Sequence, residues 1–179
     1  QTTVYTYDTA TGLLQHISDA KGRTTQYIYD PWGRLTHTLY PDGRKKEVRM
    51  EWSTDGEPGI YRVTESETGK PTLYTYFDSQ KREVRTAQLR FDGRMMKTDK
   101  VYNEQTGLLE KESLPSTDSI PYRWNRYVHD KYRRRTSTHY ASGKVDSCAY
   151  GALTDTIFEN GIRHIHSYDV TGKMTQATD

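Results

Sequence analysis

The sequence predicts an all-β protein, an antiparallel array of consecutive β-hairpins that forms one curved sheet. Three observations support this fold class. Turn residues recur at intervals of mostly about 10 to 14 positions, the spacing of an all-β meander. The segments between them alternate polar and apolar residues with period two. Short Tyr-Asp and Gly patterns also repeat along the chain, which is typical of a repeat array.

The composition agrees with a thin sheet and not with a bulky globule. Only 32% of the residues are hydrophobic, and 15 Tyr stand against 3 Phe and 3 Trp. Disordered chains also have low hydrophobicity, but they are poor in aromatic residues. A tyrosine ring supplies apolar area, and its hydroxyl tolerates a wet edge. We therefore expect a sheet whose buried face is built from tyrosine.

The turns divide the chain into its predicted strands. They fall at Gly12, Gly22, Gly33, Gly43, Gly56, Gly69, Lys81-Arg82, Asp92-Gly93, Gly107, Thr117-Asp118, Asp130-Lys131, Gly143, Gly151, Asn160-Gly161 and Gly172. The chain already has a strand pattern from Gln1 to Tyr5.

The clearest hairpin runs from Tyr27 to Leu35. Tyr27, Tyr29 and Leu35 suit a pleated, half-buried surface, and residues 30–33 between them, Asp-Pro-Trp-Gly, are turn chemistry. A second turn follows at residues 41–43, Pro-Asp-Gly, where we expect a positive φ at the glycine.

Beyond this hairpin, residues 47–52 alternate, with Val48, Met50 and Trp52 on one face and Glu47, Arg49 and Glu51 on the other. Residues 60–65 are less one-sided. Two segments break the rhythm: a longer loop at 53–59, and residues 113–121, whose prolines Pro115 and Pro121 cannot donate to a ladder. Similar copies lie on both sides of 113–121, so we expect a single array over residues 1–179 with a loop break there.

The hairpin pattern recurs in register. Tyr127–Lys144 repeats Tyr27–Arg44 one hundred positions later without a gap, and shorter copies begin at Tyr5, Tyr102 and Tyr168. The consensus tyrosines Tyr27, Tyr29, Tyr102 and Tyr168 are expected to be substantially buried on one sheet face. The arginine of the pattern can pair with the aspartate or stack on a ring. The residues that define the repeat are Tyr5, Tyr7, Asp8, Gly12, Tyr27, Tyr29, Asp30, Gly33, Arg34, Leu35, Asp42, Gly43, Tyr102, Gly107, Tyr168, Asp169 and Gly172.

The pattern Tyr-x-Tyr-Asp-x-x-Gly-Arg-Leu, followed by Pro-Asp-Gly-Arg, resembles the YD repeat of RHS (rearrangement hotspot) proteins. That family includes bacterial polymorphic toxins, wall-associated proteins, shell components of Tc-type toxins, and animal teneurins. The resemblance implies that the repeats spiral into a hollow shell, which in the bacterial toxins encloses a C-terminal effector. This chain would then be a non-catalytic, encapsulating segment of the wall of a secreted or bacterial cell-surface protein. Its partners would be the remaining repeats and an effector domain.

The copy at Tyr127 departs from the pattern at three positions, one of which is His129 in place of Tyr29. Arg133 stands where the first copy has Gly33, which predicts a different turn because only glycine adopts a positive φ at no cost. Arg135 stands where the first copy has Leu35. A guanidinium in a core-facing position is costly, so we expect this stretch at a rim or an interface.

An alternative function is a binding module that recognises carbohydrate or a cell-surface partner with a tyrosine-rich face. Tyr122, Trp124, Arg126 and Tyr127 are the candidate binding residues, because aromatic rings and basic groups alternate there. An ordinary tyrosine strand with solvated arginines explains the same residues. The formal net charge of +2 does not favour nucleic acid, and no apolar run is long enough to span a bilayer.

No catalytic, cofactor or metal site is expected. His164 and His166 lie on one face of a predicted strand, but no further ligands complete a zinc site, and their role stays open. Cys148 is expected to be a structural thiol. Finally, the strands at 2–7 and 173–177 have no evident cap, and exposed edges template pairing with another chain. We therefore expect self-association through these edge strands.

Overall fold

The computed structural model describes residues 2–121 and 123–178. Over these residues the regular structure consists of sixteen β-strands and contains no helix. The described part of the chain accordingly has no helix that could span a membrane. The all-β prediction is confirmed.

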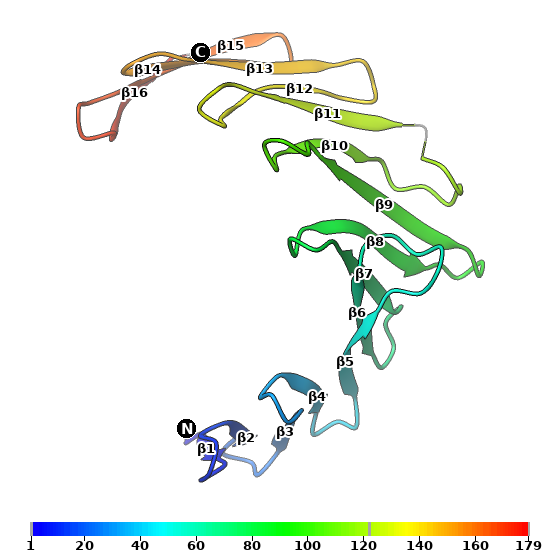
Figure 1. The fold of residues 1–179 in the computed structure, drawn as a ribbon. Helices are drawn as coiled ribbons and strands as arrows, with labels where there is room; N and C mark the ends of the chain where they lie inside the picture. The colour runs from blue at the N-terminus through cyan, green and yellow to red at the C-terminus, as the bar shows by residue number, and fades with distance from the viewer. Residues whose placement is uncertain (1, 122, 179) are drawn as a thin grey trace. The chain divides into compact units, whose positions relative to one another are not determined.

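The chain forms two compact units, Gln1–Lys97 and Thr98–Asp179, and the strands pair in sequence order (Figure 1). The first unit contains β1 (Val4–Tyr7), β2 (Leu14–Ser18), β3 (Thr24–Tyr29), β4 (Leu35–Leu39), β5 (Lys45–Trp52), β6 (Tyr61–Glu67), β7 (Leu73–Phe77) and β8 (Glu83–Leu89). β9 (Met95–Tyr102) crosses the division. The second unit contains β10 (Leu109–Ser113), β11 (Trp124–His129), β12 (Arg135–His139), β13 (Val145–Tyr150), β14 (Thr154–Glu159), β15 (Ile162–Tyr168) and β16 (Met174–Thr178).

Each unit is a single layer. Within each unit, consecutive strands are antiparallel partners, and the described strands contact only the strands before and after them in the sequence. The hairpin predicted at Tyr27–Leu35 is confirmed as β3–β4, with Tyr27 opposite Thr38. The loop predicted at 113–121 is a hairpin loop, since Ser113 pairs with Trp124 across it.

A single layer leaves little room for a core. The buried apolar residues among those described are Tyr76, 7% exposed, and Ala87, 3% exposed. Tyr27, Tyr29, Tyr102 and Tyr168 are half-buried. These four tyrosines are therefore partly covered but not fully buried, because each ring is covered only by its neighbours in a single-layer sheet.

The turns follow the glycine pattern. Gly12, Gly33, Gly43 and Gly107 have φ of 71°, 77°, 83° and 70°, which confirms the positive φ expected at Gly43. Arg133 also has a positive φ, 70°. Its N–H donates to the carbonyl of Asp130 at 2.9 Å, as that of Gly33 donates to Asp30 at 3.0 Å. The prediction of a different turn at Arg133 is wrong: the surrounding hydrogen bonds hold the same turn despite the strain on a side chain there.

The position of Leu35 and Arg135 is not a core position either. Leu35 is 39% exposed, and the Arg135 side chain lies on the surface with its guanidinium carbon 4.0 Å from the ring centroid of Tyr127. Arg135 therefore fits this site by stacking on a tyrosine while its charge stays hydrated.

Candidate functional site

The side chains of the repeat turn close the hairpin that they define. Asp30 Oδ1 accepts the N–H groups of Trp32 and Arg34, both at 2.9 Å, and Oδ2 accepts from Arg34 Nε at 2.7 Å. Desolvation works to raise the pKa of Asp30, but these hydrogen bonds from Arg34 and Trp32 outweigh it and hold the pKa below its ordinary value. One carboxylate thus satisfies two turn amides and fixes one arginine.

This aspartate–arginine pair, here called the clamp, occurs in several turns along the chain. It recurs with the same three bonds or a close variant at Asp19–Arg23, Asp78–Arg82 and Asp130–Arg134. Asp169 accepts the N–H groups of Thr171 and Lys173 in the same way. Asp8 and Asn103 cap longer turns, each accepting the N–H and the hydroxyl of a threonine three residues later.

Two of the clamped arginines, Arg34 and Arg134, also stack on aromatic rings. The guanidinium carbon of Arg34 lies 5.0 Å from the ring centroid of Trp32, and that of Arg134 lies 4.3 Å from Tyr150. Pairing with the aspartate and stacking on a ring were alternatives from the sequence, and the structure uses both at once. Arg134 therefore joins its turn to a ring in β13, whereas Arg34 stacks on a ring of its own turn.

The tyrosine hydroxyls link one hairpin to the next. Tyr29, in β3, donates to the carbonyl oxygen of Leu14, in β2, at 2.9 Å, and Tyr150 donates to that of Arg135 at 2.9 Å. Leu14 and Arg135 both begin a strand at a β-bulge, where the ladder is interrupted. The hydroxyls supply donors that phenylalanine could not, which is a physical reason for the excess of tyrosine.

Sequence reasoning missed a threonine at the same bulges. Thr36, Thr136 and Thr175 each donate the hydroxyl to a carbonyl eight residues earlier, at 3.1 to 3.2 Å. Each is the extra residue of its bulge. The signal is a threonine three residues after the positive-φ position of the turn, and it is visible in the sequence.

The predicted binding residues do not form one surface. In β11, Trp124 and Arg126 lie on one face and Tyr127 on the other, because side chains alternate along a strand. Trp124 Nε1 donates to the carbonyl of Pro121 at 3.0 Å, and the Tyr127 hydroxyl donates to Glu112 at 3.1 Å. Tyr122 lies outside the described residues.

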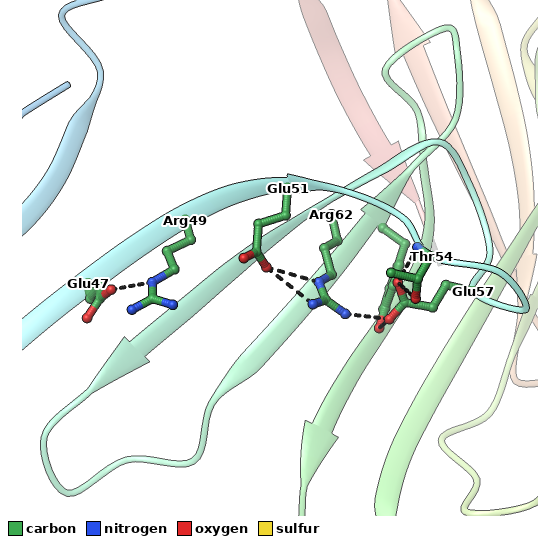
Figure 2. A network of polar contacts seen from close by, with 7 residues as sticks. Glu47, Arg49, Glu51, Thr54, Glu57 and Arg62 are labelled. Atoms are coloured by element: carbon green, nitrogen blue, oxygen red, sulfur yellow. Dashed lines mark hydrogen bonds and ion pairs between the residues drawn. The ribbon is translucent and has the colours of Figure 1, made fainter. Parts of the chain in front are cut away.

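The most developed polar network holds the β5–β6 loop (Figure 2). The carboxylate of Glu57 accepts the backbone N–H of Thr54 at 2.9 Å and the Tyr76 hydroxyl at 3.1 Å, and it pairs with Arg62. Arg62 also reaches Glu51 across the ladder, at 3.2 Å. The hydrogen bond from Thr54 lowers the pKa of Glu57, and desolvation raises that of Tyr76. The bonds to Glu57 therefore fasten the loop, and the Arg62–Glu51 pair joins β5 to β6 beside it.

Residues that could carry chemistry are scattered. No three His, Cys, Asp or Glu side chains within 2–121 and 123–178 are arranged to hold a metal ion. His164 and His166 lie opposite Ile157 and Asp155 in the β14–β15 ladder. Burial raises the pKa of Cys148, which disfavours the thiolate that a nucleophile requires.

An RHS Repeat family model matches residues 7–45. Teneurin-m of Drosophila melanogaster is 42% identical over 52 residues, which are 29% of this chain and 2% of that protein. A chain in the crystal structure of TcdB2-TccC3-Cdc42 has a similar fold, with a TM-score of 0.56 and 13% identity, over 98% of this chain and 10% of that one. This chain thus spans a small part of both proteins.

Proposed function

We propose that this chain is a non-catalytic wall segment, built from RHS (YD) repeats, of a larger encapsulating protein. The observation that carries the proposal is the use of the repeat side chains. The clamp aspartates, the stacked arginines and the hairpin-linking tyrosines all bind the chain to itself. A molecule built in this way extends by adding hairpins, with nearest-neighbour contacts as the source of stability.

We further propose that the parent protein is secreted or lies on the bacterial cell surface, as a polymorphic toxin or a wall-associated protein. The likeness to Teneurin-m and to a chain of the TcdB2-TccC3-Cdc42 structure supports this assignment. The partners in that setting are flanking repeats, which pair with β1 and β16, and an enclosed effector domain.

Hydrogen exchange tests the wall function. The backbone amides of Val4–Tyr7 and Met174–Thr178 are followed in the isolated chain and in the parent protein. Pairing with flanking repeats predicts strong protection of both strands in the parent only, while β7, flanked on both sides here, serves as an internal control. Equal exchange of β1 and β16 in both proteins would contradict the proposal.

Carbohydrate binding is the second candidate function. The observation in its favour is that Tyr5 and Tyr7 are each 55% exposed, so ring surface is open to stack on a sugar. A glycan array tests it, with Tyr5→Ser and Tyr7→Ser as the variants expected to lose the signal. No bound glycan, or binding unchanged in both variants, would rule out this tyrosine face.

A further inference from the structure

The C-terminal half of β5, from Val48 to Trp52, has a partner strand on one side only. β5 is eight residues long and β4 is five. The β4–β5 ladder ends at the pair His37–Glu47, whereas the β5–β6 ladder continues to the pair Trp52–Tyr61. On the β4 side, no described strand pairs with β5 beyond Glu47.

Two backbone hydrogen bonds fix which groups of β5 point to this open side. The carbonyl of Lys45 accepts the N–H of Thr68 at 3.0 Å, and the N–H of Ser53 donates to Ile60 at 2.8 Å. Odd-numbered residues from 45 to 53 therefore direct their backbone groups to β6, since the direction alternates in an antiparallel ladder. The N–H and C=O groups of Met50 and Trp52 face away from β6, into the open edge.

A groove runs along this edge. It has a volume of about 730 Å³ and lies between the β3–β4 turn, with Asp30 and Arg34, and the β5 segment from Val48 to Glu51. Arg34 Nη1 approaches Met50 Sδ to 3.1 Å. Trp52 is 77% exposed. The groove is therefore open to solvent beside a row of backbone donors and acceptors.

Charges flank this row on one face of the strand. Arg49 is well exposed and binds Glu47 through Nε, so its two Nη groups are available to a carboxylate. Glu51 is part-exposed and pairs with Arg62. The opposite face of β5 carries Val48, Met50 and Trp52, so an added strand would meet apolar side chains there.

We propose that this edge binds an extended peptide as an antiparallel strand. The peptide places an acidic residue opposite Arg49, a basic residue opposite Glu51 and an apolar residue opposite Met50. Backbone groups at two-residue spacing are complementary to another strand, and opposite charges facing each other across a strand pair are stabilising. The site lies inside the array, so it differs from the terminal edges at β1 and β16.

The probe is the capped peptide Thr-Arg-Val-Glu-Val-Thr, whose first five residues face Trp52 to Val48 in antiparallel register. Binding is followed by amide chemical shifts of the isotope-labelled 179-residue protein. A charge-reversed peptide, Thr-Glu-Val-Arg-Val-Thr, is the matched control, and a copy of the probe methylated on the nitrogen of its central Val lacks the N–H that faces Met50. The proposal predicts saturable shifts at residues 48–53, with at least tenfold weaker binding of the methylated copy.

Two protein variants complete the test. Met50→Pro removes an N–H that β6 does not use, so it is expected to keep the fold and weaken binding at least tenfold. Arg49→Glu is expected to abolish the preference between the two charged peptides, because each peptide then makes one opposite-charge pair and one like-charge pair with residues 49 and 51. Four outcomes would each overturn the proposal. The shifts could centre on Val4–Tyr7 or Met174–Thr178, or the methylated peptide could bind equally well. The charge preference could be unchanged in Arg49→Glu, or binding could fail to saturate at millimolar peptide.

Discussion

At the scale of single residues, stability depends on small polar groups because so few side chains are buried. Tyr29 illustrates this, since its ring is half-buried and its hydroxyl donates to Leu14 in the preceding hairpin. A hydrogen bond of this kind contributes about 0.5–1.5 kcal/mol, a noticeable share of the stability of a small domain. The tyrosines therefore act as links between hairpins as much as apolar cover.

Tyr29→Phe is expected to lower the free energy of unfolding by about 0.5–1.5 kcal/mol, because it leaves the Leu14 carbonyl without this donor. Chemical denaturation measures the change. Tyr132→Phe is the matched control, since Tyr132 lies exposed at a hairpin tip. Equal effects of the two substitutions would show that the hydroxyl of Tyr29 adds nothing.

Gly43 tests the turn conformation alone. Its φ is 83°, and no atom lies within 4 Å of an added Cβ. Gly43→Val is expected to destabilise by more than about 1 kcal/mol, because a β-branched residue fits a positive φ poorly. Gly43→Asn, which tolerates this conformation better, should cost less. An unchanged denaturation midpoint in the valine variant would contradict the assigned turn.

Gly59 adds a steric requirement. A Cβ there would lie 2.9 Å from the carbonyl carbon of Phe77 and closer still to its oxygen, which accepts the N–H of Ile60 at 2.7 Å. Gly59→Ala is therefore expected to lower the melting temperature more than Gly43→Ala, although both positions have a positive φ. Equal melting temperatures would mean that the β5–β6 loop moves aside without cost.

At the scale of elements, many of the hairpin turns contain an aspartate whose ionised side chain stabilises the turn. The pKa is held below the ordinary 3.8 by hydrogen bonds at Asp8, Asp19, Asp30, Asp42, Asp78, Asp92, Asp130 and Asp169. Between the folded and unfolded pKa values the unfolded chain binds more protons, so stability rises with pH there. The contribution is complete above about pH 3.8 and is lost as the pH falls through the lower, folded-state values.

We therefore expect the melting temperature to fall as the pH is lowered from about 4 to 2. Asp30→Asn is the matched variant, because Asn103 shows that an amide oxygen can accept turn N–H groups at 2.8 and 3.1 Å. The variant should lose part of this pH dependence. A melting temperature that is constant over this range would contradict the clamp as a source of stability.

At the scale of the molecule, each described strand contacts only its neighbours in sequence. In the 179-residue chain, β1 and β16 consequently have a partner strand on one side only. All side chains of β1 and β16 are exposed. An edge that presents free backbone groups favours association.

The isolated chain is expected to self-associate through β1 and β16. Light scattering over a concentration series should show a mass that rises above 20.8 kDa. Tyr5→Lys combined with Ala177→Lys should reduce the effect, because lysine on an edge strand opposes pairing. A constant monomer mass at high concentration would show that these edges are blocked.

Local features of this protein were determined by its sequence alone. Period-two alternation, turn residues at regular spacing and the copy of Tyr27–Arg44 at Tyr127–Lys144 were sufficient for the strands, the hairpins and the positive φ at Gly43. These features depend on residues within one hairpin, and the physics that sets them is local: backbone conformation, side-chain direction and turn hydrogen bonds.

Only the tertiary structure decided how the hairpins contact one another. Three findings depend on the strand register and on the number of layers. They are the half-burial of Tyr29, the stacking of Arg135 on Tyr127, and the placement of Trp124 and Tyr127 on opposite faces. A pattern of alternation shows that a strand has two faces, but not what covers either of them. Arg133 also makes a contact that its own hairpin does not predict, because its Nη2 donates to the carbonyl of Thr106, in another hairpin, at 3.0 Å.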